Sequence, residues 1–273
     1  MILTYEIHDL QPYINWAYYY HAWQLRDVAQ QQKSRAEAED ILSQLDGHYH
    51  VYALFDLFNA YSQGDVIHLT EGLSPCEVRL PLLRQQQGDC LCLADFIPPQ
   101  NKTVNFQLST FTSKIGVFAT SVDHGLEKDF DKDAYMKMTV QLLADRLAEA
   151  AAEKMHEEVR RTYWGYAPDE HLTMEELHAE KFQGIRPAVG YPSLPDTSLN
   201  FVLDELIHFK QIGIRLTESG AMKPHASVSG LMIALPEAHY FSLGKIGEDQ
   251  LQDYAHRRGL PVETLRKFLA SHL

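Results

Sequence analysis

Gly184-Ile185-Arg186-Pro187-Ala188-Val189-Gly190-Tyr191-Pro192 is the segment with the most distinctive local chemistry in this 273-residue chain. It holds two glycines and two prolines within nine residues, and Pro195 follows shortly after. Proline fixes φ and lacks an N–H donor, so the segment cannot form a helix or a regular strand. Glycine lets the backbone approach another group closely. The segment is therefore predicted to be a fixed loop that holds the side chain of Arg186 in place.

The arginine of this loop has two interpretations. A guanidinium held rigidly presents a planar fork that matches a carboxylate, which predicts a clamp for a ligand carboxylate. The alternative is a connecting loop whose arginine packs or caps locally, and the residues alone do not decide between the two. Small residues also dominate positions 217–230. They could bring backbone close to a ligand or to a large flat cofactor, but a tight loop before a strand is the simpler interpretation.

The spacing of apolar residues around the loop predicts the secondary structure. Recurrence at three and four residues, with Pro168 and Gly259 as stop signals, predicts helices. These are expected over residues 30–45, 50–61, 134–166, 197–211, 248–258 and 261–272. Short apolar runs bounded by turn residues predict strands. These are expected over residues 66–69, 90–96, 104–111, 115–120, 227–233 and 240–246, with a hairpin at residues 113–114.

The order of these elements is helices, then strands, then helices and strands mixed. That order predicts an α+β fold with an antiparallel or mixed sheet, because a doubly wound sheet would need regular strand–helix alternation. Neither a Gly-x-Gly-x-x-Gly motif after a strand nor a Walker-type phosphate loop occurs in the sequence. The usual signatures of nucleotide-binding α/β domains are therefore missing.

The overall composition excludes several classes of protein. A formal net charge of −13 disfavours nucleic-acid binding, because phosphate contacts need clustered lysine and arginine. The apolar runs are too short to span a bilayer, and no secretory signal opens the sequence. Three cysteines do not make a disulfide framework. We expect a cytoplasmic protein with reduced thiols.

One polar stripe follows the long helix expected over residues 134–166. Its members recur at spacings of three and four: Asp145, Arg146, Glu149, Glu153 and His156. Such a stripe is usually a solvated face. The pairs His48/His50 and Cys90/Cys92 would each need two more ligands from elsewhere to hold a metal, so no metal site is predicted.

Several separated segments, taken with the loop, resemble the activation (reactivation) domain of cobalamin-dependent methionine synthase. The opening Tyr13-Ile14-Asn15-Trp16 is similar to the family's first motif. Further similar segments are residues 84–96, 144–150, 156–168, 216–222, 226–230, 240 and 253–259. The resemblance covers nearly the whole chain and rests on independent motifs.

The resemblance implies a C-shaped single domain over residues 1–273, with a twisted, largely antiparallel sheet flanked by helices. Its N-terminal helical part, about residues 13–62, would pack on the α+β body. The implied function is to bind S-adenosylmethionine and present this methyl donor for reductive methylation of cob(II)alamin. The cobalamin would be carried by another methionine synthase chain, and a flavodoxin-like protein would supply the electron. The protein would be a component of the methyltransferase, not active alone, and would need no catalytic residue because the cobalt is the nucleophile.

The resemblance also assigns ligand-binding residues. Arg186 matches the position that binds the methionine carboxylate. Ala188 matches the position where backbone groups hold the adenine or ribose, and Gly190 belongs to the same ligand-binding loop. Glu149 and Tyr240 match further ligand-contacting positions.

Two residues match positions that face the corrinoid. Tyr191 would face the corrin, and Asp145 would contact the released histidine of the cobalamin module. Asn15 departs from the family, which has an aspartate there that is expected to pair with the ammonium group of the ligand. Asparagine keeps an acceptor oxygen and loses the charge, and a charge-assisted hydrogen bond is roughly twice as strong as a neutral one. Lower affinity is therefore expected.

Two alternative functions remain, and Asn15 motivates the first of them. One is a non-catalytic module that docks on a corrinoid protein and has lost its ligand. The other is a reactivation subunit for a different corrinoid methyltransferase. The leading hypothesis remains the reactivation subunit of a split methionine synthase.

Overall fold

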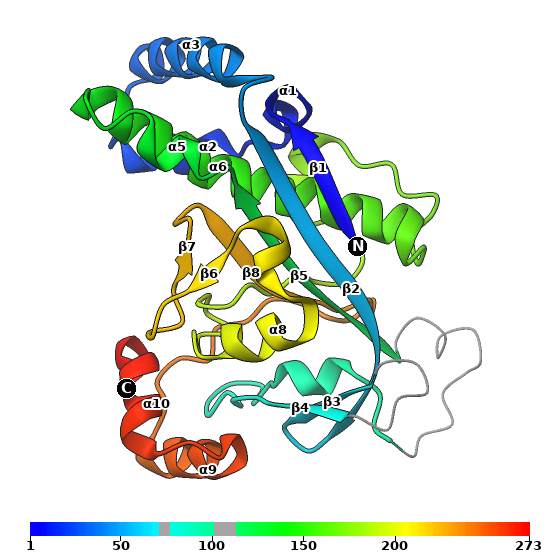
Figure 1. The fold of residues 1–273 in the computed structure, drawn as a ribbon. Helices are drawn as coiled ribbons and strands as arrows, with labels where there is room; N and C mark the ends of the chain where they lie inside the picture. The colour runs from blue at the N-terminus through cyan, green and yellow to red at the C-terminus, as the bar shows by residue number, and fades with distance from the viewer. Residues whose placement is uncertain (71–76, 101–112) are drawn as a thin grey trace.

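A computed structural model describes residues 1–70, 77–100 and 113–273. In these residues a six-stranded sheet runs in the order β4-β3-β2-β5-β8, with β1 also paired to β2 (Figure 1). Every pairing in it is antiparallel, which confirms the predicted α+β class. The strands are β1 (Ile2–Glu6), β2 (His50–Gln63), β3 (Val66–Thr70), β4 (Glu77–Pro81), β5 (Lys114–Val122) and β8 (Ser227–Met232). A separate two-stranded ribbon pairs β6 (Arg215–Leu216) with β7 (Met222–Lys223).

The long central strand β2 corrects the helix expected over residues 50–61. One edge of β2 pairs with β1 near His50 and with β3 near Gln63, while its other edge pairs with β5. Both faces of β2 are buried: Val51 and Phe55 lie in one core cluster and Phe58 in the other. A strand buried on both faces reads as a continuous apolar run, which periodicity alone does not separate from a helix. The N-terminal part is therefore helical only as far as Leu45.

Of three other expected strands, two are wrong and one falls outside the described residues. Residues 240–246 have no regular secondary structure and do not pair in the sheet, and residues 240–242 line the cavity described below. Residues 90–96 contain a 3-10 helix, Leu93–Phe96, in which the side chain of Asp95 accepts from the N–H of Cys92. The strand expected over residues 104–111, and with it the hairpin, lies outside the described residues.

Five of the six predicted helices are confirmed, with somewhat different bounds. They are α3 (Val28–Leu45), α6 (Ala134–Glu158), α8 (Leu199–Ile207), α9 (Glu248–Arg258) and α10 (Val262–Phe268). The shorter helices are α1 (Ile7–Leu10), α2 (Trp16–Ala22), α5 (Gly125–Lys128) and α7 (Met174–His178), with 3-10 turns at Gln11–Tyr13, Phe209–Ile212 and Ala270–His272. None of the helices in the described part of the chain is long and apolar enough to cross a membrane.

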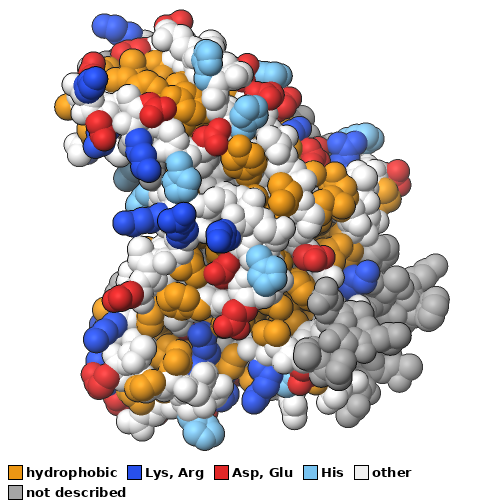
Figure 2. Space-filling view, viewed as in Figure 1, with side chains coloured by type: hydrophobic (Ala, Val, Ile, Leu, Met, Phe, Trp, Pro, Cys, Tyr) orange, Lys and Arg blue, Asp and Glu red, His pale blue; other side chains and the backbone are white. Residues whose placement is uncertain are grey.

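The sheet separates two layers of helices. Helix α6 packs against β2, β5 and β8, and its Leu143 and Leu147 lie in the same core cluster as Phe118 of β5. Helix α8 packs on the same three strands from the other cluster. Figure 2 shows that the outline is indented on one side, between the α2–α3–α6 end and the α9–α10 end of the molecule, consistent with the expected C shape.

The C-terminal end of α6 carries a fully buried histidine, His156. Its Nε2 lies 3.4 Å from the hydroxyl of Tyr166, and its ring packs edge-on against Phe182. Burial lowers the pKa of His156 well below its ordinary value, and the guanidinium groups of Arg160 and Arg186 lower it further. The ring is therefore neutral in the folded protein at neutral pH.

This lowered pKa predicts acid sensitivity. In the unfolded chain the pKa of the His156 ring is about 6.5. Below that pH the unfolded chain therefore binds a proton that the folded protein does not. The free energy of unfolding should then fall by up to about 1.4 kcal/mol per pH unit because of this one group. Urea unfolding of wild type and His156→Gln between neutral pH and pH 5 should show a shallower slope for the variant. Replacing the exposed His171 by glutamine is the control, and an equal slope in His156→Gln and wild type would contradict the prediction.

Candidate ligand-binding site

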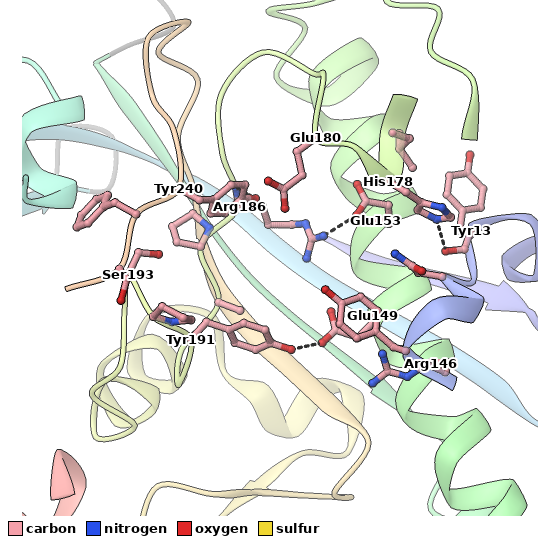
Figure 3. A pocket seen from close by; sticks show the side chains of 18 residues that line it. Tyr13, Arg146, Glu149, Glu153, His178, Glu180, Arg186, Tyr191, Ser193 and Tyr240 are labelled. Atoms are coloured by element: carbon pink, nitrogen blue, oxygen red, sulfur yellow. Dashed lines mark hydrogen bonds and ion pairs between the residues drawn. The ribbon is translucent and has the colours of Figure 1, made fainter. Parts of the chain in front are cut away.

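A cavity of about 580 Å³ lies between α6, the loop that contains Arg186, and the N-terminal residues before α2 (Figure 3). It brings together residues that lie far apart in the sequence. Six of the residues predicted from the sequence line the cavity: Asn15, Glu149, Arg186, Ala188, Tyr191 and Tyr240. It is also lined by Tyr13, Tyr18, Arg146, Glu153, Leu177, His178, Glu180, Pro187, Pro192, Ser193, Phe241 and Ser242. Gly190 and Asp145 do not line it.

Strand β8 holds the loop in place. The N–H of Val189 donates to the carbonyl of Ser229 at 2.9 Å, and the N–H of Leu231 donates to the carbonyl of Pro187 at 3.0 Å. Ile185 exchanges two backbone hydrogen bonds with Ile233. The loop therefore runs along the edge of the sheet through isolated bridges and forms no regular strand, as its prolines predict.

Two glycines allow this close approach. Gly184 has φ +81, and a Cβ built on it would lie 2.2 Å from the carbonyl oxygen of Ile233. A Cβ on Gly230 would lie 2.2 Å from the carbonyl oxygen of Pro187. A glycine is thus needed at position 230 because the loop backbone packs on it. This is a different role from the tight loop or ligand contact considered from sequence.

Arg186 is almost completely buried, with 9% of its side chain exposed. Its Nη2 donates to Oε2 of Glu153 at 2.8 Å, and its backbone N–H donates to the hydroxyl of Tyr240 at 2.9 Å. Burial lowers the pKa of the guanidinium, but Glu153, Tyr240 and Glu149 together outweigh this, so the pKa lies above its ordinary value and Arg186 is charged. Its Nε, also buried, has no hydrogen-bond partner among the described residues.

Three carboxylates share the cavity with this arginine: Glu149 and Glu153 from α6, and Glu180 from the segment after α7 (Figure 3). Glu180 has φ +56, a left-handed conformation that non-glycine residues rarely adopt outside turns and functional sites. Burial raises the pKa of its carboxyl, and the nearby Glu153 raises it further. Oε1 of Glu153 is buried and has no partner within the described part of the chain.

Several of these side chains were not predicted from the sequence. Arg146 and Glu153 belong to the stripe that was interpreted as a solvated face, yet both line the cavity. Their spacing of three and four from Glu149 was the available signal, because residues so spaced share one face of a helix. His178 and Glu180 carried no signal, since only the fold brings their segment to the cavity.

The remaining predicted residues have specific contacts. Oδ1 of Asn15 accepts from the N–H of Ala17 and caps α2. The hydroxyl of Tyr191, a residue 49% exposed, donates to Glu149 across the cavity. Asp145 lies outside the cavity, 3.6 Å from the ring of His225, and burial raises the pKa of its carboxyl. Gly190 has φ +89 and turns the loop, with its N–H donating to the carbonyl of Leu194.

Chemically, the cavity offers one buried guanidinium and three carboxylates within a volume suited to a small molecule. This arrangement fits a ligand that carries both a carboxylate and a cationic group. The fold and the cavity together define an α+β domain built to hold a small charged molecule.

Comparison with known proteins identifies the family. Residues 6–259 match the family model described as vitamin B12 dependent methionine synthase, activation domain, so the chain belongs to that family. Among solved structures, a crystal structure of the MetH reactivation domain bound to AdoHcy is similar over 100% of this chain and 90% of that chain. The sequence identity is 36% and the TM-score is 0.88. The resemblance predicted from the motifs is confirmed.

Proposed function

We propose that this protein binds S-adenosylmethionine in the cavity around Arg186 and presents it for the reductive methylation of a cobalamin held by a partner chain. The observation that carries the proposal is the buried Arg186 beside three carboxylates, in a fold shared with a reactivation domain that was crystallised with AdoHcy. The reaction in this proposal is inferred from the family, and the binding is inferred from the residues that line the cavity.

The residues present fit this ligand. Buried polar groups nearly always have hydrogen-bond partners, and Nε of Arg186 and Oε1 of Glu153 have none among the described residues. A carboxylate on the ligand would accept from Nε of Arg186, and an ammonium group would donate to a neighbouring carboxylate. The backbone of Ala188, with Pro187 and Tyr240, would hold the adenosine part.

The work of the protein in this proposal is to bind and orient. When bound, S-adenosylmethionine supplies a methyl group activated by its sulfonium, and the partner's cobalamin supplies the nucleophile. Holding two reactants in the right geometry removes much of the entropic barrier to their reaction. Tyr191, exposed at the cavity, would face the corrin, and Asp145 of α6 would contact the released histidine of the cobalamin module. A flavodoxin-like protein would deliver the electron.

A further part of the proposal is that these 273 residues act in trans, on a cobalamin-binding methionine synthase chain. Calorimetry with S-adenosylmethionine and S-adenosylhomocysteine tests binding. Titrating the protein into an oxidised methionine synthase that lacks this domain, with S-adenosylmethionine and a reductant, tests reactivation. We expect saturable formation of methylcobalamin, because a free subunit must replace the effective concentration that a linker provides.

The outcomes separate the candidate functions. Ligand binding without methylcobalamin at any subunit concentration would contradict action on methionine synthase and favour a different corrinoid methyltransferase. Absence of ligand binding, with binding to the corrinoid protein intact, would favour the docking module.

Asn15 provides a separate prediction. Asn15→Asp keeps the acceptor that caps α2 and adds a negative charge at the edge of the cavity. If the ammonium group of the ligand lies here, affinity for S-adenosylmethionine should rise by about threefold to tenfold, since a hydrogen bond to a charged group exceeds a neutral one by about 1 kcal/mol. Calorimetry with an analogue lacking the α-amino group is the control. Equal gains for both ligands would mean that Asn15 does not contact the ammonium.

A further inference from the structure

Arg160 lies where α6 changes its geometry. The helix is α-helical to Glu158 and continues as a π-helix over Val159–Tyr163. Short π segments within helices occur frequently at functional sites. The side chain of Arg160 is completely buried, with 0% exposed. A buried arginine needs a paired charge, because an isolated ion is costly to remove from water.

Two residues make specific contacts with the buried guanidinium. Its Nε donates to both carboxylate oxygens of Glu170, at 3.1 and 3.0 Å, and its Nη2 donates to Oε1 of Glu170 at 2.6 Å. The ring of Phe182 also packs on the guanidinium, with its centroid 4.3 Å from the guanidinium carbon. Planar two-point pairing of this kind fixes orientation as well as distance. Arg160 therefore holds two residues that are twelve positions apart in the sequence.

The segment between these two contacts forms one wall of the cavity. It contains α7 and supplies Leu177, His178 and Glu180 to the cavity lining. Helix α7 has only five residues, which is too short to be stable in isolation. Its position must come from tertiary contacts. One of these joins Nε2 of His178 to the carbonyl oxygen of Tyr13 at 3.1 Å.

We propose that Arg160 is a positioning residue for the ligand site. By holding Glu170 and Phe182, it fixes both ends of residues 170–182 and so places His178 and Glu180 against the cavity. Arg160 itself does not line the cavity. Phe182 also packs edge-on against His156 and precedes Gly184 by two residues, so the same contact supports the start of the Arg186 loop. The inference rests on the proposed binding of S-adenosylmethionine.

The test compares two variants that each lose an arginine ion pair. Arg160→Met with Glu170→Gln removes the buried pair without leaving an unpaired buried ion. The control is Arg84→Met, because Arg84 joins Asp65 and Asp95 in a region that does not line the cavity. Affinity for S-adenosylmethionine is measured by calorimetry at a temperature at which wild type and both variants are folded. Amide hydrogen exchange over residues 173–183 is measured without ligand.

Only the Arg160/Glu170 variant should bind about tenfold more weakly and exchange faster over residues 173–183, since small displacements of positioning groups are costly. Arg84→Met should bind like wild type even where its melting temperature falls. If the double variant does not fold, Glu170→Gln alone is judged by the same two measurements, with a loss of about threefold expected.

Wild-type affinity together with unchanged exchange would overturn the positioning role. Failure of the wild-type protein to bind S-adenosylmethionine would instead contradict the proposed function. In that case the exchange over residues 173–183 still decides whether Arg160 fixes this segment.

Discussion

Arg186→Ala is expected to weaken S-adenosylmethionine binding by at least about tenfold. A hydrogen bond to a charged group contributes about 1.5–3 kcal/mol, and 1.4 kcal/mol corresponds to a factor of ten in affinity. Arg186 is held by the loop and by Glu153, so its guanidinium is positioned before the ligand arrives. Calorimetry on wild type and variant measures the effect.

The same substitution removes the partner of a buried carboxylate, so stability should fall as well. Breaking a buried pair by removing one partner typically costs about 3–5 kcal/mol. Arg186→Lys separates the two effects, because it keeps the charge beside Glu153 and loses the planar fork. It should retain more stability than Arg186→Ala and still bind weakly. The control is Arg35→Ala, which removes an arginine from an exposed pair on α3. Equal affinity in wild type and Arg186→Ala would remove Arg186 from the binding site.

Gly230→Ala is expected to disrupt both the fold and the site. The added Cβ would lie 2.2 Å from the carbonyl oxygen of Pro187 and 2.9 Å from the Cα of Ala188. Both are backbone atoms, so the loop must move away from β8. Overpacking of this kind typically costs about 1–3 kcal/mol. The displaced loop carries Arg186 and Ala188, so ligand affinity should fall together with the melting temperature.

A second glycine serves as the control for this substitution. Gly244→Ala adds a methyl group where nothing lies within 4 Å, although at φ +72 it introduces backbone strain. We expect a loss of about 1–2 kcal/mol and unchanged affinity. Thermal unfolding and calorimetry on the three proteins provide the comparison. A stable Gly230→Ala variant with wild-type affinity would show that the close packing of the loop on β8 is not required.

The helical part of the fold was largely predictable. The apolar spacing predicted α3, α6 and α9, with Pro168 and Gly259 as stop signals for the last two, and their observed bounds lie close to the predicted ranges. The central strand β2 was not predictable from periodicity. Its two buried faces remove the alternation that marks a strand, so the apolar residues from Val51 to Ala60 looked like a helix.

The candidate site, too, was predictable from the sequence only in part. The loop, its arginine and the family were predictable from the sequence itself, because proline fixes φ and glycine permits backbone conformations that other residues rarely adopt, whatever surrounds them. Only the tertiary structure decided which side chains Arg186 meets. Glu153 looked like part of a solvated stripe and forms its ion pair. Glu180 showed no local signal, because its place depends on the contacts of Arg160 with Glu170 and Phe182, which no local sequence pattern encodes.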